Sequence, residues 1–445
     1  MLAKVMDVTE ARSIYQTDYL RLKKERSGQR NAWTHKIRDE AMACFAKLGF
    51  PTNKDEEWRF TNVNPIATHP FEPPQYDIKG LTADAVQRAG LGTLAAGAVV
   101  FVNGWFSPEL SFLRGIEQEV KVGSLAVALN EGWEWIEAHL ARYASYRDHA
   151  FVALNTAMMQ DGASVYIPPG RLVKEPIHLL FISTPAKKAA VSHPRNIIFI
   201  GRGSQATIVE NYVGLEKGNY FTNAVTEIVV GENAVLDHYK LQRESEEAFH
   251  VATLQARLGR NGNFSSQSIS LGGALVRNDV NVVLDGEGSE CALNGLYLVS
   301  GVQHVDNHTR IDHVRPHGTS RQLYKGVLDG KSSAVFNGKI YVHKGAGKTD
   351  ARQTNKNLLL SLDARIDTKP QLEIYNNDVK CTHGSTIGQL DQDAVFYLRS
   401  RGIGERSARS LLTYAFASDL IGLIRVDSMR AQLDKLLAAR LQKDS

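Results

Sequence analysis

Apolar residues near the start of the chain recur at helical spacing. Over residues 10–48 they alternate with many charged residues. One stripe of apolar positions, three or four residues apart, contains Ala41, Cys44, Phe45 and Leu48. This spacing predicts a helical N-terminal region. Residues 51–74 are irregular and rich in proline, which predicts a surface crossing between two folded parts.

From about residue 98 to residue 375 the period of the apolar residues changes to two. Clear examples are the segments 206–212, 234–240 and 280–285. Turns rich in Gly, Asn and Ser separate these short runs, and hardly any helical pattern interrupts them. Alternation of apolar and polar residues is typical of β-strands, so the sequence predicts a large all-β body.

The β region also contains a loose repeat of the form Gly-x-x-small-x-apolar. Its glycines step along the chain by 28, 28, 29 and 42 residues, and they are Gly203, Gly231, Gly259, Gly288 and Gly330. A recurring period of this length favours stacked β-coils, that is, a solenoid or β-helix, over a sandwich.

After Leu390 the helical period returns. Asp391 or Asp393 can cap a first helix that stops at Gly402. A longer helix and a final helix are predicted from the apolar positions Ala408, Leu412, Phe416, Leu420, Met429, Leu433, Leu436 and Leu437. We therefore predict an N-terminal helical region with an irregular linker (1–95), a β core (96–380) and a C-terminal helical domain (381–445).

Composition narrows the class of protein. The chain has 445 residues, enough for a substantial core, and its three cysteines are far apart, which fits a reducing compartment. The 52 basic and 48 acidic residues are interspersed, which weighs against nucleic acid as a partner. The N-terminus lacks an apolar signal region, and no stretch approaches about 18 consecutive apolar residues, so we expect a cytoplasmic protein with no membrane partner.

Cys381 and His383, in the segment 379–384, are the first candidate site. On one extended strand their side chains leave the same face, with the Cα atoms about 6–7 Å apart. A thiolate and an imidazole placed in this way can bind one metal ion or one edge of a cluster, and they suit iron, zinc or copper. A stable cluster or structural zinc takes four ligands, so the others come from a distant segment, from a partner chain, or do not exist. The alternative interpretation is a buried cysteine beside a surface histidine.

A second candidate is the polar face of the segment 304–313. His304, Asp306, His308 and Arg310 share one face of a predicted strand. Such a face can be a metal-binding or acid–base ladder, but it is more typical of a solvated or interface-facing row of charges. Cys291 occupies the small-residue position of the repeat, so we expect it to pack in the core.

Motifs for catalysis are absent from the sequence. The chain contains no GxxxxGK[ST], GxSxG or HExxH pattern. We therefore expect no nucleotide hydrolysis and no nucleotide of its own.

Several segments together resemble one known family. The run 371–391, which contains Cys-Thr-His-Gly, is similar to the C-terminal signature of the SufB/SufD family, and 396–402 continues it. Further matches are the segments 56–61, 101–104, 154–157, 320–326, 335–342 and 357–360. SufB-like members typically carry Glu after the motif histidine, where this chain has Gly384, so the resemblance is to the SufD type.

The resemblance implies a right-handed parallel β-helix between helical ends and a non-catalytic role as scaffold in iron–sulfur cluster assembly. It implies SufB as a partner at the end of the β-helix and the ATPase SufC as a partner of the C-terminal helices, over residues 391–424. His383, with Cys381 beside it, would contribute ligands to a transient Fe–S cluster shared with the partner. Two other functions stay open: a β-helix enzyme such as a polysaccharide lyase, which would use the 304–310 face, and a metal-storing homodimer.

Overall fold

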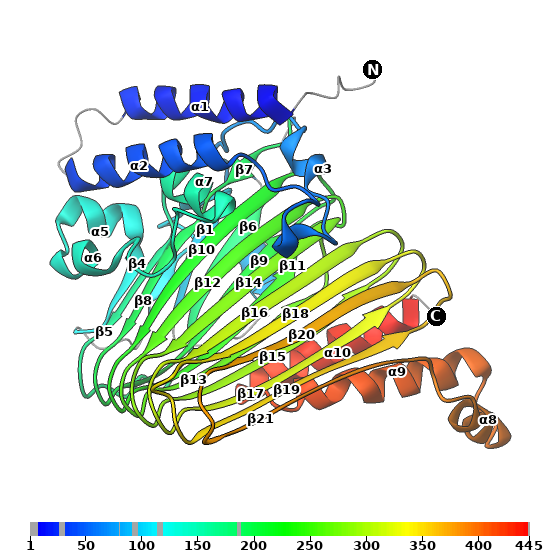
Figure 1. Ribbon diagram of the computed structural model, residues 1–445. Helices are drawn as coiled ribbons and strands as arrows, with labels where there is room; N and C mark the ends of the chain where they lie inside the picture. Colours follow the sequence, from blue (N-terminus) through cyan, green and yellow to red (C-terminus); the bar gives the residue numbers. More distant parts are fainter. Residues whose placement is uncertain are drawn as a thin grey trace.

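Two long parallel β-sheets face each other along most of the chain, with helices at both ends of the sequence (Figure 1). The computed structural model describes residues 8–25, 32–79, 81–90, 97–113, 119–184 and 188–443. The chain winds from one sheet to the other, so neighbours in each sheet are alternate strands of the sequence. The result is a β-solenoid of about eight turns between residues 164 and 388. The predicted solenoid between helical regions is confirmed.

In sheet I, which contains most of the odd-numbered strands, successive strands of the sequence are added at the same edge. Its spatial order is β2 (Trp105–Phe106), β1 (Gly97–Val102), β6 (Ile177–Ser183), β9 (Gln205–Gly214), β11 (Val235–Arg243), β13 (Asn263–Ser270), β15 (Glu290–Val299), β17 (Thr319–Leu328), β19 (Thr349–Leu359) and β21 (Val379–Gly388). The short β3 (Phe112–Leu113) also pairs with β1, and β2 and β3 run antiparallel to it.

In sheet II, successive strands of the sequence are likewise added at one edge. Its spatial order is β4 (Lys121–Ser124), β5 (Ala163–Ile167), β8 (Arg195–Ile200), β10 (Phe221–Val230), β12 (Phe249–Leu258), β14 (Leu275–Leu284), β16 (His304–His313), β18 (Ser333–Val342) and β20 (Arg365–Ile374). The short β7 (Val191–Ser192) also pairs with β10, and β4 is antiparallel to β5.

The interior of the solenoid is built from ladders of inward-facing residues. One ladder of sheet I contains Ala206, Leu236, Phe264 and Cys291 at consecutive coils, and all four are buried. Each strand therefore places alternate residues in a shared core, which is the origin of the two-residue period in the sequence. Cys291 packs in this core as predicted.

Successive coils, up to the one before the last, turn one corner through a residue with positive φ. These corner residues are Gly170, Gly203, Asn233, Asn261, Gly288, His317 and Lys348. Each of their backbone N–H groups donates to a carbonyl of the following coil, at 2.6–3.1 Å. The left-handed conformation turns this N–H along the solenoid axis, so the corner continues the hydrogen bonding of the sheets.

The repeat predicted from glycines mixes two different positions of this corner. The residue two places before the left-handed one lies against the backbone of the adjacent coil, and glycines there are Gly201, Gly231, Gly259 and Gly286. In the predicted repeat, Gly203 and Gly288 are left-handed residues instead, and Gly330 lies at the opposite corner, before β18. The period is therefore real, but its alignment was wrong by two residues in places.

Most of the N-terminal helices cover sheet II. The N-terminal helices are α1 (Val8–Glu25), α2 (Ala32–Leu48), η1 (Glu56–Trp58), α3 (Asn64–Ala67) and α4 (Ala83–Ala89). Phe45 on α2 and Phe71 in the linker pack in one cluster with Phe221 and Phe249 of the sheet. In contrast, α4 packs on sheet I, against Val100 and its neighbours.

The predicted β core contains helices that the sequence pattern did not reveal. They are α5 (Leu125–Glu131), α6 (Glu134–His139) and α7 (Ala150–Met158), all between β4 and β5. Eight of the nine residues of α7 are buried, which removes the polar face that a helical period requires.

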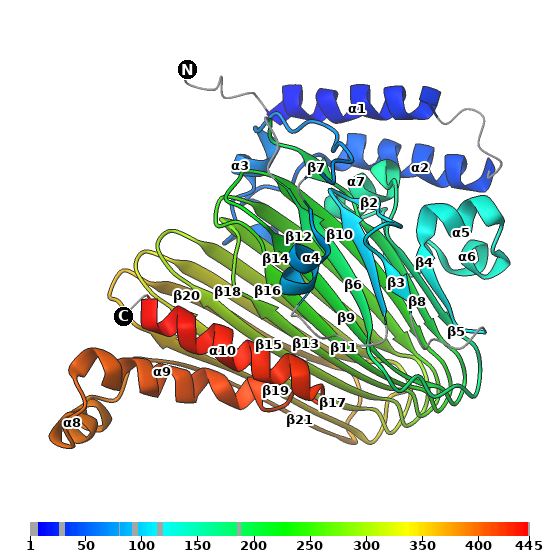
Figure 2. The same cartoon turned by 180° about the vertical axis from the view of Figure 1, so that it is seen from behind.

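The C-terminal helices are α8 (Gln392–Ser400), α9 (Glu405–Ile421) and α10 (Asp427–Lys443), and Asp391 caps α8 as predicted. α9 and α10 lie across the outer face of sheet I (Figure 2). An apolar cluster holds them there, and Lys325 adds an ion pair to Asp419 at 2.6 Å. The helices α9 and α10 therefore pack against strands β11 to β17.

The predicted domain boundary between residues 380 and 381 falls inside β21, since this strand continues to Gly388. The division into three domains stays a prediction. Within the described part of the chain, no helix is long and apolar enough to cross a membrane.

We expect Gly286→Ala to destabilise the solenoid. The added Cβ would overlap backbone atoms of Gly259 and Arg260 in the adjacent coil. Overpacking of this kind lowers the free energy of unfolding by about 1–3 kcal/mol, which urea denaturation can measure. Gly218→Ala is the control, since a Cβ there meets nothing within 4 Å. Equal stabilities for the two variants would contradict the close packing of the corner.

Candidate functional site

The solenoid is open at its C-terminal end. Among the described strands, β20 pairs only with β18, and β21 pairs only with β19. Each of these ten-residue strands therefore has one free edge of backbone N–H and C=O groups. The inward-facing Ile374 and Ile387 are 40% and 52% exposed, because no further coil covers them. Long free edges of this kind template pairing with another strand, so they are normally covered.

Cys381 and His383 both lie on this terminal strand. Their register partners on β19 are Ala351 and Gln353, which are buried in the interior, so both side chains face inward. Cys381 is half-buried and packs beside Ile340 and Val342. His383 is exposed. The structure thus places the two predicted site residues on one face, at the mouth of the solenoid.

The chemistry of this pair is incomplete within the chain. Burial raises the pKa of the Cys381 thiol, and the Asp350 carboxylate adds to this effect against a backbone hydrogen bond from Ala351. The surroundings of this thiol therefore do not favour the thiolate. The described residues contain no group of three or more His, Cys, Asp or Glu side chains that could hold a metal ion.

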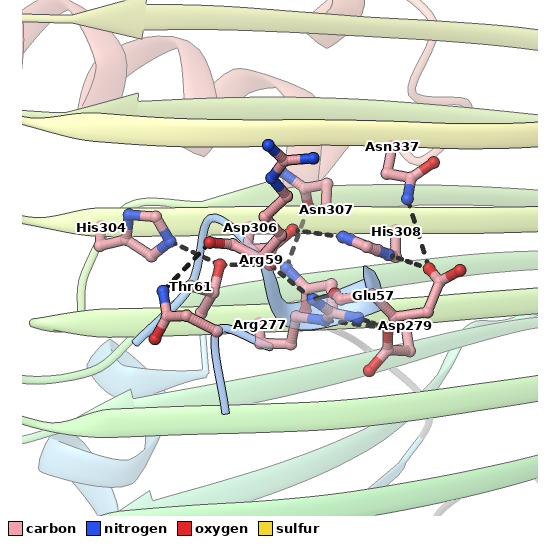
Figure 3. A network of polar contacts seen from close by, with 12 residues as sticks. Glu57, Arg59, Thr61, Arg277, Asp279, His304, Asp306, Asn307, His308 and Asn337 are labelled. Atoms are coloured by element: carbon pink, nitrogen blue, oxygen red, sulfur yellow. Dashed lines mark hydrogen bonds and ion pairs between the residues drawn. The ribbon is translucent and has the colours of Figure 1, made fainter. Parts of the chain in front are cut away.

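The second predicted site, on β16, is covered by another part of the chain. Residues 55–61, which we call the strap, cross the outer face of sheet II (Figure 3). Thr61 Oγ1 donates to Asp306 Oδ2 at 2.5 Å, and it also contacts His304 Nε2 at 2.9 Å. His308 Nδ1 lies 3.2 Å from Glu57 Oε2.

The strap contacts four successive strands of sheet II. On β14, Arg277 Nη1 donates to the Glu57 carbonyl at 2.8 Å, and its guanidinium lies over the Trp58 ring at 4.1 Å. The β16 contacts come next, and on β18 Asn337 donates to Glu57 at 3.3 Å. Lys369 on the terminal strand β20 donates to Glu56 at 2.5 Å. The strap therefore reaches the open end of the solenoid.

Electrostatics hold this network in one charge state. Burial opposes ionisation of Asp306, but Arg277 and then His308 and Thr61 bring its pKa well below the usual range. For His308, burial and Arg277 oppose the charged form, yet Asp306 and Glu57 outweigh them and raise its pKa. Arg277 Nη1 is 2.6 Å from Asp306, and His308 Nε2 is 3.1 Å from the same carboxylate. The charged groups of this network are therefore paired with one another.

The polar face of β16 is an internal interface for most of its length. His304, Asp306 and His308 face the strap rather than solvent or a ligand. Arg310 stands apart and pairs with Asp312 on its own strand at 2.6 Å. Glu57, Thr61 and Arg277 were missed as members of the network. The signal for two of them was present, because the segment 56–61 is a conspicuous polar and aromatic run in an otherwise irregular linker.

A further set of ionisable residues lies inside the solenoid. Glu210 lies 3.3 Å from His238, and Glu244 lies 2.7 Å from His250, all four buried. Between them, burial lowers the pKa of Lys240 to about 8 against the opposing carboxylates. Periodicity in the sequence does not identify this set, because it does not distinguish inward polar residues from outward ones.

Comparison with known proteins gives matches over nearly the whole chain. Residues 181–416 match the family model described as SUF system FeS cluster assembly, SufBD core domain, and residues 10–179 match the SufBD protein N-terminal region. The chain is 34% identical to an iron–sulfur cluster assembly SufBD family protein of Synechocystis, over 91% of this chain and 90% of that protein. It is 33% identical to the iron–sulfur cluster assembly protein SufD of Escherichia coli, over 89% and 90%. A Bacillus subtilis protein of the same name is 25% identical, over 93% and 95%.

We expect His308→Gln to lower the free energy of unfolding by an amount that depends on pH. Since the folded pKa of His308 is raised, its ion pairs contribute stability that is fully present below its ordinary value of about 6.5. That contribution is lost as the pH rises through the folded value. The difference in free energy of unfolding between the wild type and the variant should therefore be larger at about pH 6 than at about pH 9, as measured by urea denaturation.

Glu57→Gln removes one of the two carboxylates that face His308, so in this background the same comparison should depend less on pH. A difference that is constant across this range would contradict a charged His308 in the network.

Proposed function

The chain belongs to the SufBD family of SUF-system iron–sulfur cluster assembly proteins, and from this premise we propose that it is a non-catalytic scaffold subunit with half of a transient cluster site. Cys381 and His383 form that half-site. The cluster is cargo, and a SufB-type partner supplies the remaining ligands. A SufC-type ATPase binds the C-terminal helices.

The open end of the solenoid supports the partner interface. Its two free strand edges and the exposed Ile374 and Ile387 form a surface that another solenoid end can continue. A partner that pairs with β20 and β21 would satisfy their backbone groups and cover this apolar surface. Cys381 and His383 would then lie between the two chains. A second copy of this chain could cover the same end when the partner is absent.

The two-ligand count supports a transient site. A cluster normally takes four protein ligands, and this strand supplies two. A shared site holds the cluster only while both chains keep their geometry, so a movement at the junction can release it. The raised pKa of the Cys381 thiol fits the same role, because the thiolate forms only when metal arrives. His383 is the stronger of the two ligand candidates, and Cys381 contributes less.

The C-terminal helices support a docking role. Phe396 and Tyr397 on α8 are 71% and 58% exposed, an unusual exposure for adjacent aromatic residues, and Leu411 on α9 is also exposed. Only residues 389–391 separate α8 from β21, the strand of Cys381 and His383. Movement of an ATPase bound to α8 would therefore act directly on the terminal strand. This is the route by which we propose that ATP binding opens the half-site to sulfur and iron.

The enzyme alternative lacks support from the site. Of its four candidate residues, His304, Asp306 and His308 contact the strap. The fourth, Arg310, pairs with Asp312 on its own strand.

We expect His383→Ala to lower cluster formation on the assembled complex by roughly tenfold or more, since metal sites are sensitive even to the loss of residues that only orient a ligand. The absorbance of the cluster and its iron and sulfide content measure the yield. Cys381→Ala should lower the yield less. The matched control is Thr382→Ala, on the same strand but on its outward face. An unchanged yield from an intact complex with His383→Ala would exclude the role of His383.

We expect the double variant Phe396→Asp, Tyr397→Asp to bind the SufC-type ATPase at least about 2 kcal/mol more weakly, as for aromatic hot spots. Isothermal titration measures this, and the melting temperature should change little because both side chains are exposed. Leu20→Asp, at a 59% exposed apolar position on α1, is the control. Equal affinities for the double variant and the control would place the docking surface elsewhere.

A further inference from the structure

Gln353 lies directly beneath His383 in the wall of the solenoid. The two residues are register partners on β19 and β21, and both side chains face the interior. Adjacent strands are about 4.8 Å apart, so the Gln353 amide is the neighbour that the imidazole meets along this ladder. The two differ sharply in freedom, because His383 is exposed and Gln353 is only 1% exposed.

The Gln353 amide is held in one orientation. Its Nε2 donates to the Gly338 carbonyl of sheet II at 3.1 Å, across the interior. A carbonyl oxygen accepts hydrogen bonds but cannot donate them, so the amide must turn its nitrogen toward Gly338. A Cβ at residue 338 would overlap this same amide, so the glycine makes room for the Gln353 side chain.

The other end of the amide is a fixed acceptor with no use inside the chain. Gln353 Oε1 is buried and has no hydrogen-bond partner among the residues that the structure describes. Buried acceptors are nearly always bonded, because an unbonded one loses the hydrogen bonds that water would supply. The imidazole above it can supply an N–H, since exposed side chains change rotamer within nanoseconds.

We propose that Gln353 is a positioning residue for His383. Gln353 Oε1 accepts a hydrogen bond from Nδ1–H of His383, which leaves Nε2 without a proton and directed out of the open end. The inference rests on the proposed role of His383 as a cluster ligand. An imidazole binds metal through its unprotonated nitrogen, and a hydrogen bond at the other nitrogen decides which one that is.

A neutral amide suits this position better than a carboxylate. Cys381 faces the same interior two residues away, and its thiol must lose a proton to bind metal. A carboxylate at residue 353 would add a negative charge near the developing thiolate and oppose that loss. The amide oxygen orients the imidazole without this penalty.

The test is Gln353→Met, which keeps the length of the side chain but removes both hydrogen bonds. In the full-length chain labelled with ¹⁵N at histidine, His383 is identified by the ring signals that disappear in His383→Ala. We expect the wild-type ring to be the Nδ1–H tautomer and the variant ring to return to the Nε2–H tautomer that free histidine prefers. In the assembled complex, the variant should lower the cluster yield about tenfold, as expected for a residue that orients a metal ligand.

Gln322→Met is the matched control. Gln322 is the next residue of the same ladder, one coil deeper, and is equally buried, and it donates to Thr309 at 2.5 Å. This variant should leave the His383 tautomer unchanged. An unchanged tautomer in Gln353→Met would overturn the proposal, and so would an equal shift in Gln322→Met, which would show a general loosening of the interior.

The outcomes separate this proposal from the proposed function. A shifted tautomer together with full cluster yield in His383→Ala would support the Gln353 contact and reject the ligand role. Loss of clusters in His383→Ala with no tautomer shift in Gln353→Met would keep the ligand role and reject Gln353. Thermal melting of each variant shows that the solenoid is intact.

Discussion

The hydrogen-bonding requirement of the backbone governs this structure. Each coil satisfies its N–H and C=O groups only through the coils before and after it, in both sheets and at the left-handed corner. Such a stack leaves unpaired backbone groups at each end unless something covers them. At the first end, short antiparallel strands cover β1 and β5. The last end has no such cover within the described chain, and the candidate site lies there.

Contacts on both sheets hold the open end of the solenoid in a defined shape. On sheet I, α9 and α10 are fixed by an apolar cluster, and three residues link the end of the terminal strand to α8. On sheet II, the strap reaches the terminal strand from the N-terminal half of the sequence. The terminal strand β20 is thus attached to a distant part of the chain, and β21 is joined to the C-terminal helices by a short link.

Much of the architecture could be read from the sequence, because a solenoid repeats its local physics. Alternation identified strands such as β9, β11 and β14, and the C-terminal helices followed from their apolar stripe. The fully buried α7 escaped, since a helix without a polar face has no helical period. The repeat was misaligned because two corner positions both favour glycine, one for its φ and one for its missing Cβ.

For the candidate site, contacts between residues close in sequence could be predicted, and contacts between distant residues could not. Cys381 and His383 are close in sequence, so their shared face could be deduced from strand geometry alone. The partners of Asp306 could not, since Thr61 is 245 residues away, and no local pattern encodes a contact over that separation. The Gln353 amide depends on Gly338 in the opposite sheet, which again needs three dimensions to be seen.

The strap also fixes the number of coils. Repeat proteins commonly gain or lose whole repeats, because each repeat contacts only its neighbours. Here residues 55–61 contact four successive strands, β14, β16, β18 and β20. Removing or duplicating one coil would leave these contacts out of step with the terminal strand. The strap therefore ties the stability of this protein to a fixed number of coils between β14 and β20.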